Sequence, residues 1–489
     1  MKKILLAVAC FAMTLLAQAN PTHKVKINDG LTVSVEACSE SIFRIKVSPR
    51  KDFTESLMER YELIKTDWSE VKTDISDKGG VWTLKTPEYS LAINKKTGVM
   101  TVKDAKGGKV IREVRFLPEK EGLCGEMRSF INEKYADLKV ADNGGGIIGD
   151  DNGKFGEVDK HEIPAADAVS ILSFSMEDGE RFYGGGSTSR DHIQHRGEFL
   201  RMWTTYQQTE IPMPFMMSSR GWGVYNNSTR KSFFDIGNQQ KSKFNIINTF
   251  DEADFFLMMG KDMPAILNEY TLVTGRTYVL PKWAYGLCFG PNMREEQFDI
   301  LNDAVRFRQF DVPCDVFWLE PQWMEKRYDF STKKKWNYDR FSPEPYWLQD
   351  QYPKTMHNRL FIGKLRSMGF HLGLWLCEEY DLSIQEEDII AERTGGKLSG
   401  QEHWMDHLTV FMDQGVEGFK LDPARTIDNH TNWEYYNGRT DKEMHNLNQV
   451  LLPKQMRELG RKYNGKRTWH HYCGGWSGTQ RWTASTSGD

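Results

Sequence analysis

The sequence predicts a multidomain protein in which an all-β, sandwich-like N-terminal domain precedes a (β/α)8 TIM barrel. A chain of 489 residues exceeds the usual size of one domain. From about residue 24 to about residue 260, apolar and polar residues alternate between glycine-containing turns; after Pro281, apolar strand-like segments alternate with amphipathic helical patterns. We therefore place the β-sandwich domain at residues 20–278 and the barrel at residues 279–489.

The first 19 residues have the pattern of a cleavable secretory signal peptide. The segment MKKILLAVACFAMTLLAQAN contains two lysines, an apolar stretch and the small-residue triplet Ala17-Gln18-Ala19. Cys10 would be the modified cysteine of a lipoprotein, but Ala7-Val8-Ala9 before it is a poor lipobox. Cleavage after Ala19 predicts a periplasmic or secreted protein that begins near Asn20. No later apolar run approaches the roughly 20 residues of a membrane span.

Composition excludes some partners and favours others. The 64 basic and 68 acidic residues give a net charge of only −4, which argues against a nucleic-acid partner. Fifteen tryptophans are many, and tryptophan-rich clefts suit sugar rings, although most tryptophans in any protein belong to the core. The seven cysteines are widely scattered without CxxC spacing, so neither a zinc knuckle nor a disulfide framework is predicted.

The β domain is predicted from hairpin patterns. The stretch YSLAINKKTGVMTVKDAKGGKVI alternates apolar and polar residues between glycine-containing turns, as expected of a sheet with one buried face. A short helical pattern then leads into Pro281, after which strands alternate with helices.

The barrel region contains six strand-like segments separated by helical patterns. These segments are Leu287–Gly290, Asp315–Glu320, His371–Leu376, Gly418–Leu421, Thr468–Tyr472 and Thr483–Ser487. The helical stripes are Phe361, Leu365 and Met368 in one helix, and Trp404, Leu408 and Phe411 in another. Thr440 and Glu443 have the spacing of a capping box, which predicts that a further helix begins there.

Six parallel strands suit either an open doubly wound sheet or most of a barrel. A nucleotide-binding open sheet needs a glycine-rich turn after its first strand, whereas here that strand runs into Pro291-Asn292-Met293, so the barrel is favoured. About six of eight barrel strands are present, and we expect strand six to end at Asp489, with the barrel incomplete in this chain.

Acidic residues follow three of the predicted strands. Glu320, Asp422 and Asp489 each end an apolar run, and the carboxyl ends of barrel strands gather at one mouth. A single acid there is usually a helix cap or the partner of a lysine. Three acids favour a catalytic pair in which one carboxylate attacks a sugar carbon and the other donates a proton.

No metal and no cofactor are predicted. His470 and His471 are adjacent, but neighbouring strand residues face opposite sides of a sheet and cannot easily chelate one ion.

Several motifs resemble glycoside hydrolase family 31, the retaining α-glycosidases that include α-glucosidases and α-xylosidases. The resemblance covers nearly all of the predicted mature chain. It rests on FKLD at 419–422, on GD at 488–489, and on the interval between Asp422 and Asp489. Further matching segments are RFYGGGSTSRDHIQHRG, RGWGVYNN, VPCDVFWLEPQWMEK, GLWLCEEYDL and DKEMHNLNQVLLPK.

The resemblance assigns roles to individual residues. Asp422 corresponds to the catalytic nucleophile and Asp489 to the general acid/base. Lys420 would help to keep Asp422 ionised, since a nearby positive charge lowers the pKa of a carboxyl group. Glu320, Trp375 and Trp323, with Met324 beside it, correspond to positions that line the sugar site.

The sequence departs from the family pattern at three places. Glu320 stands where the family usually has Asp, and Arg425 stands where many members have Glu. The segment Tyr472-Cys473-Gly474-Gly475 replaces a region in which the family often has an arginine that binds ring hydroxyls. Losing that side chain opens volume, which favours a sugar with a bulkier substituent than glucose, such as α-N-acetylgalactosamine.

The resemblance therefore implies a retaining, exo-acting α-glycoside hydrolase that forms a covalent glycosyl-enzyme intermediate on an oligosaccharide or glycan substrate. Two alternatives remain at this point: a non-catalytic carbohydrate-binding relative and an α-transglycosylase.

Overall fold

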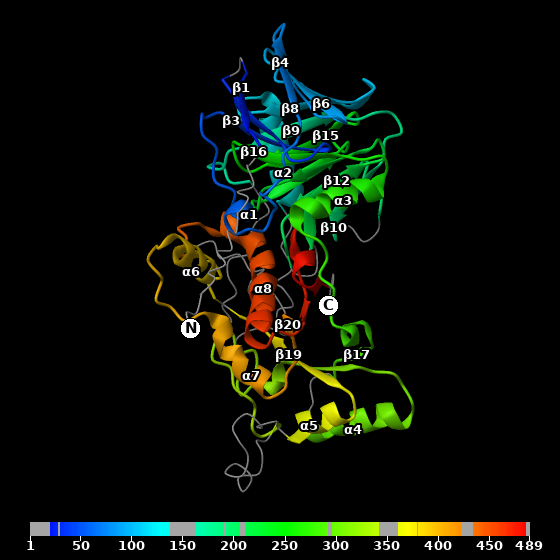
Figure 1. Ribbon diagram of the computed structural model, residues 1–489, viewed down its shortest axis with the longest axis vertical. Helices are drawn as coiled ribbons and strands as arrows, with labels where there is room; N and C mark the ends of the chain where they lie inside the picture. Colours follow the sequence, from blue (N-terminus) through cyan, green and yellow to red (C-terminus); the bar gives the residue numbers. More distant parts are fainter. Residues whose placement is uncertain are drawn as a thin grey trace, which may run out of the picture.

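The structure of the protein is a computed structural model. It describes residues 20–27, 30–136, 163–188, 192–205, 211–291, 296–341, 360–378, 380–421 and 434–485. Figure 1 shows a β-rich part and an α/β part stacked along the long axis, with α1 and α8 where the two parts meet.

The β-rich part consists of two antiparallel sheets. The seven-stranded sheet has the order β1 (His23–Lys26), β2 (Thr32–Ala37), β3 (Ile42–Ser48), β16 (Ala253–Met259), β13 (Trp222–Asn226), β12 (Pro212–Ser218), β10 (Phe182–Gly186). The nine-stranded sheet has the order β11 (Phe199–Met202), β14 (Ser232–Ile236), β15 (Lys243–Asn248), β9 (Ser170–Ser175), β8 (Lys109–Leu117), β7 (Met100–Asp104), β6 (Tyr89–Asn94), β5 (Val81–Lys85), β4 (Asp74–Lys78). Three helices accompany them: α1 (Leu57–Arg60), α2 (Gly122–Tyr135) and α3 (Met263–Thr274).

Aromatic side chains fill the space between the two sheets. Phe174 of β9 stacks on Trp222 of β13 with ring centroids 5.2 Å apart, and Phe182 of β10 lies 5.4 Å from Phe244 of β15. Helix α2 packs through Ile131 on the outer face of the nine-stranded sheet. Helix α3 covers the seven-stranded sheet, where Tyr270 stacks on a phenylalanine of β12 at 4.0 Å. The predicted sandwich-like packing of two sheets is present.

The α/β part is built on a parallel sheet of six strands in sequential order. The strands are β17 (Cys288–Phe289), β18 (Val316–Leu319), β19 (His371–Leu376), β20 (Gly418–Leu421), β21 (Trp469–Tyr472) and β22 (Ala484–Ser485). The α-helices are α4 (Gln297–Gln309), α5 (Leu360–Ser367), α6 (Ser383–Thr394), α7 (Thr409–Asp413) and α8 (Asp441–Asn464). Single 3-10 turns are η1 (Lys282–Tyr285), η2 (Pro321–Trp323), η5 (Trp404–Leu408) and η6 (Thr479–Arg481).

All six predicted strands are found, and their order supports a barrel. Each strand pairs in parallel with the next one along the chain, whereas a doubly wound sheet reverses its strand order at a switch point. The capping box is also present, with the Thr440 amide donating to the Glu443 carboxylate at 3.3 Å. The predicted helix through Trp404 and Phe411 is instead the 3-10 turn η5 followed by the short helix α7.

The two faces of this sheet carry different side chains. On the outer face, Phe317 of β18 meets Phe307 of α4, with ring centroids 6.0 Å apart. On the inner face, the indole of Trp318 covers two glycines: Gly373, its register partner on β19, and Gly418, the register partner of Gly373 on β20. A Cβ atom on Gly373 would lie 1.8 Å from the Trp318 ring. Both glycines are therefore required for this tryptophan to occupy the interior.

Adjacent histidines of β21 lie on opposite faces, as the sequence predicted. His470 is fully buried on the outer side, where it stacks on Phe419 at 6.0 Å and its Nε2 atom lies 2.8 Å from the Thr468 hydroxyl. His471 lies on the inner side, with its ring centroid 5.8 Å from that of Trp469. Burial lowers the pKa of His470 to about 3.

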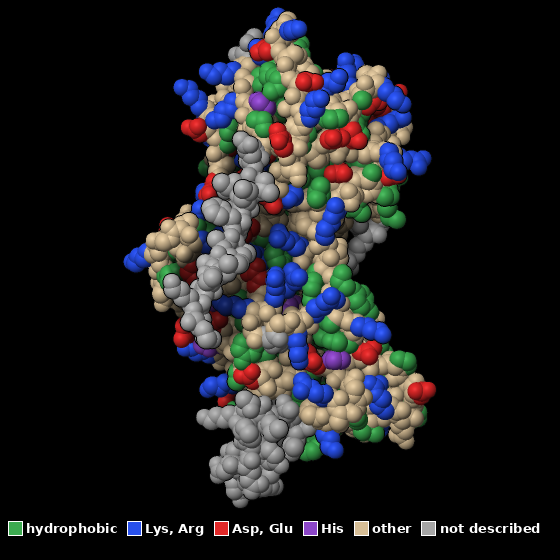
Figure 2. Space-filling model, in the orientation of Figure 1, with side chains coloured by type: hydrophobic (Ala, Val, Ile, Leu, Met, Phe, Trp, Pro, Cys, Tyr) green, Lys and Arg blue, Asp and Glu red, His purple; other side chains and the backbone are tan. Residues whose placement is uncertain are grey.

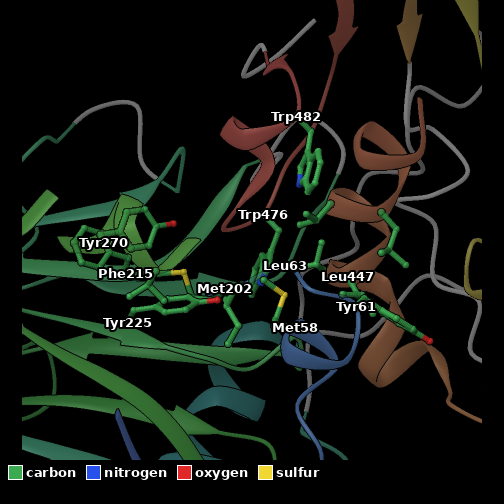
Figure 3. Close-up of a cluster of buried hydrophobic side chains, with 14 of the residues drawn as sticks. Met58, Tyr61, Leu63, Met202, Phe215, Tyr225, Tyr270, Leu447, Trp476 and Trp482 are labelled. Carbon is green, nitrogen blue, oxygen red and sulfur yellow. The ribbon is translucent and has the colours of Figure 1, made fainter. Parts of the chain in front are cut away.

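A mixed apolar cluster joins the two parts of the molecule (Figure 3). Met58, Tyr61 and Leu63 from the segment around α1 lie beside Leu447 of α8, and Trp476 and Trp482 contribute from the segment after β21. The β-rich part supplies Met202, Phe215, Tyr225 and Tyr270 to the same cluster. The side chains are buried, so the two parts share one continuous core.

Replacing Gly373 by alanine tests the packing of the inner face. The added methyl group would overlap the Trp318 ring, so we expect Gly373→Ala to lower the free energy of unfolding by about 1–3 kcal/mol. Gly363→Ala in helix α5 is the matched control, because a Cβ atom there would meet no neighbouring group within 4 Å; we expect it to be neutral or to stabilise by about 0.5–1 kcal/mol. Urea unfolding measures both. Equal effects would contradict the close packing of Trp318 on Gly373.

The buried His470 predicts a dependence of stability on pH. Its pKa is about 3 in the folded chain against 6.5 for an ordinary histidine, so between these values the unfolded state binds more protons. The stabilisation is complete above pH 6.5 and falls with decreasing pH by up to about 1.4 kcal/mol per pH unit for this proton. His470→Gln removes the titration. Urea unfolding of both proteins from pH 7 to pH 4 measures the difference, and a constant difference would contradict a neutral buried His470.

Candidate active site

Four side chains form one layer on the inner face of the parallel sheet, near the carboxyl ends of its strands. Trp375 of β19 pairs in register with Lys420 of β20, and Lys420 pairs with His471 of β21. Register partners in a parallel sheet project from the same face. Glu320 follows β18 two residues after Trp318, whose register partner Gly373 is two residues before Trp375, so Glu320 belongs to the same layer.

Glu320 and Lys420 form an ion pair although 100 residues separate them in the chain. The Lys420 Nζ atom lies 3.3 Å from Glu320 Oε1, and the two side chains are 14% and 22% exposed, lysine first. A Cβ on Gly290, just after β17, would lie 3.7 Å from Glu320 Oε1, so the pair spans the inner face from β17 to β20. Partial exposure leaves room for additional hydrogen-bond partners on both groups.

The two predicted site tryptophans have different positions. Trp375 of β19 is buried, with 2% of its surface exposed, and meets the Tyr328 ring edge to face, with ring centroids 5.5 Å apart at an angle of 72°. Trp323 in η2 is completely buried, packs against Phe411 of α7 at 5.0 Å, and donates its indole N–H to the Trp375 carbonyl at 2.8 Å. Trp323 therefore holds the backbone of the Trp375 strand in this structure, and its predicted contact with a sugar stays a prediction.

An aromatic floor closes the interior beneath the polar layer. Trp318 and Trp469 lie one layer below, edge to face, with ring centroids 5.1 Å apart. Trp283 of η1 stacks on His371 at 4.5 Å at the amino-terminal end of the sheet. Apolar rings thus lie on this side of the Glu320–Lys420 pair, and an apolar environment strengthens electrostatic interactions.

Some of the predicted residues lie outside the described part of the chain. Asp422, Asp489 and Arg425 are among them. Cys473, at the place of the missing family arginine, is described and is buried at 6% exposure. Next to it, a Cβ on Gly475 would lie 3.0 Å from Ile211, so the β-rich part reaches the strand ends here.

Two residues in or beside this layer, His471 and Tyr328, were not predicted as site residues from the sequence. The sequence indicates His471 only as half of a possible metal pair, and no pattern in it points to Tyr328. The alternation of faces that separates His470 from His471 also places His471 on the same side as Lys420, but only the strand register shows that they are neighbours.

Neither a metal site nor a membrane span is found in the described residues. No three His, Cys, Asp or Glu side chains converge there as a metal site would require. None of the described helices combines the length and apolar character needed to cross a lipid bilayer. Acidic and basic side chains are intermixed over the face of the β-rich part that Figure 2 shows, in keeping with the net charge of −4.

Curated relatives are carbohydrate-active enzymes of low sequence identity. An α-xylosidase of Emericella nidulans is 22% identical over 354 residues, which cover 66% of this chain and 43% of the relative. An α-xylosidase of Saccharolobus solfataricus is 27% identical over 319 residues, covering 60% of this chain and 40% of the relative. The chain thus spans less than half the length of these relatives.

A solved structure with the same fold is a family 31 dextranase of Flavobacterium johnsoniae. It superposes with a TM-score of 0.68 at 18% identity, over 96% of this chain and 56% of the dextranase chain. At this identity the likeness concerns the fold alone.

Two family profiles match most of the sequence. Residues 32–235 match the glycosyl hydrolase 31 N-terminal galactose mutarotase-like domain, and residues 277–489 match the glycosyl hydrolases family 31 TIM-barrel domain. The motifs, the two-part architecture and these profiles agree, and the chain belongs to glycoside hydrolase family 31.

Proposed function

We propose that the protein is a retaining, exo-acting α-glycoside hydrolase that works through a covalent glycosyl-enzyme intermediate. The observation that carries the proposal is the Glu320–Lys420 pair at the carboxyl end of the six-stranded sheet, because Lys420 precedes Asp422 by two residues. In an extended strand, residues two apart project from the same face. The proposed nucleophile and the polar layer would then share one site. The signal-peptide pattern of residues 1–19 would place this activity outside the cytoplasm.

In the proposed first step, the Asp422 carboxylate attacks the anomeric carbon and the bond to the leaving oxygen breaks. Protonated Asp489 gives its proton to that oxygen, and a glycosyl ester of Asp422 forms. In the second step, Asp489 removes a proton from water, whose oxygen attacks the anomeric carbon and releases Asp422. Two inversions give retention of configuration. Carboxylates alone supply the acid, base and nucleophile of this scheme.

The polar groups of the layer suit a sugar. Glu320 accepts hydrogen bonds from hydroxyl groups, Lys420 donates to hydroxyl oxygens, and the lysine charge would favour the ionised form of Asp422. The apolar faces of pyranose rings pack well on aromatic side chains; the partly exposed Tyr328, which lies against the buried Trp375, provides one here.

Removing the proposed nucleophile should abolish turnover. In the complete enzyme, we expect Asp422→Ala to reduce hydrolysis of an aryl α-glycoside by about 10⁴-fold or more. Azide should restore activity and yield a glycosyl azide of inverted configuration, because the small anion can occupy the vacated position. Asp413→Ala is the control, since Asp413 is exposed at the end of α7.

Two outcomes would replace the proposal with an alternative. If the complete wild-type protein binds glycans but is not labelled by a mechanism-based fluoroglycoside, the protein is a non-catalytic carbohydrate-binding relative. If it is labelled and passes the glycosyl group to a sugar rather than to water, it is an α-transglycosylase.

The departure at Cys473 predicts the substrate. With the family's arginine replaced by a small side chain, we expect an aryl α-N-acetylgalactosaminide to be hydrolysed with a higher kcat/KM than the α-glucoside, by about 10-fold or more. A panel that also contains the α-galactoside and the α-xyloside measures this. Preference for the unsubstituted α-glucoside would refute it.

A further inference from the structure

We propose that His471 is a specificity-determining residue that hydrogen-bonds a substituent of the sugar bound at the polar layer. This inference rests on the proposed function, and it assigns a role to a side chain that the mechanism above does not use.

The position of His471 follows from strand register. It is the register partner of Lys420, and Lys420 is the register partner of Trp375, so the three side chains project from the same face at the same level. The Glu320 carboxylate reaches this level from β18 and contacts Lys420 at 3.3 Å. His471 therefore adjoins the ion pair along the inner face.

Two indoles hold the His471 ring. Its centroid lies 5.8 Å from that of Trp469 and 6.1 Å from that of Trp318, and both tryptophans are buried in the layer below. The imidazole rests on this floor and is itself only partly buried. The two apolar rings restrict where the imidazole can lie.

The chemistry of the imidazole complements that of its neighbours. Glu320 in its ionised form only accepts hydrogen bonds, and Lys420 only donates them. A neutral imidazole donates from one nitrogen and accepts at the other, which matches a sugar hydroxyl or an acetamido group. The layer would then offer all three hydrogen-bonding modes to one ring, and a sugar lacking the matching substituent would not make the hydrogen bond to the imidazole.

Two variants of adjacent residues separate recognition from folding. We expect His471→Ala to reduce kcat/KM for the preferred aryl glycoside by about 10- to 100-fold and to change the ratio of kcat/KM between glycosides. His471→Asn, which keeps one donor and one acceptor, should recover part of this loss. His470→Ala is the matched control on the opposite face, and we expect it to lower Tm without changing the ratio between glycosides.

Calorimetry also measures how His471 affects selectivity. The experiment compares the binding of N-acetylgalactosamine, galactose and glucose to the Asp422→Ala variant, with and without the additional change His471→Ala. If the wild type is inactive, hydrolysis is refuted, while binding still decides the role of His471. An unchanged selectivity in His471→Ala, or a loss that only parallels a lower Tm as in His470→Ala, would overturn the assignment.

Discussion

The placement of helix α8 is the constraint on which the rest of the structure depends. The helix is buried over most of its surface, and several of its buried side chains are polar. Asn446 accepts a hydrogen bond from the Thr204 amide at 3.0 Å and donates to the Thr229 carbonyl at 2.9 Å; His445 Nε2 lies 2.8 Å from the Thr204 carbonyl. A buried polar group without a partner costs about 1–3 kcal/mol, so a shift of α8 relative to the β-rich part would forfeit several such bonds at once.

The same helix fixes the segment that follows β21. Pro453 has no backbone N–H and therefore cannot bond the Gln449 carbonyl as the helix pattern would require. That carbonyl instead accepts a hydrogen bond from the Thr479 hydroxyl at 3.3 Å, while the Tyr472 hydroxyl donates to the Gln449 side chain at 2.5 Å. A buried ion pair between Lys454 and Glu386 ties the middle of α8 to α6. One helix thus positions β21, its following loop and the β-rich part together.

Sequence patterns predicted the strands well where apolar runs have sharp ends. His371–Leu376 and Gly418–Leu421 have the predicted bounds, because polar residues or turns flank short, continuous apolar segments. The prediction of one helix through Trp404 was wrong, because the apolar spacing of a 3-10 turn followed by a short helix resembles that of one longer helix. Trp323 shows a different limit: an aromatic residue near an acid has the same local pattern whether it faces a sugar or the core.

The inner face illustrates what local sequence cannot supply. Nothing in the local sequence shows why Gly373 and Gly418 must be glycines. The strand register gives the reason, because it places the Trp318 indole over both of them. The Glu320–Lys420 contact likewise follows from pairing across β18, β19 and β20: the strand-end pattern singled out Glu320, and the family resemblance singled out Lys420, but neither predicted that the two side chains meet. Alternation along β21 separates His470 from His471, but it does not say which histidine faces the interior.

The layered interior also explains why polar chemistry can be concentrated at one end of the sheet. Trp318 and Trp469 occupy the level below Glu320, Lys420 and His471, so apolar rings cover that side of the polar layer. An ion pair that is closed to water on one side is stronger than a fully solvated pair, yet its exposed fraction still permits a ligand to approach. Gly373 and Gly418 therefore affect the site without belonging to it, because they make room for the Trp318 indole that lies beneath the polar layer.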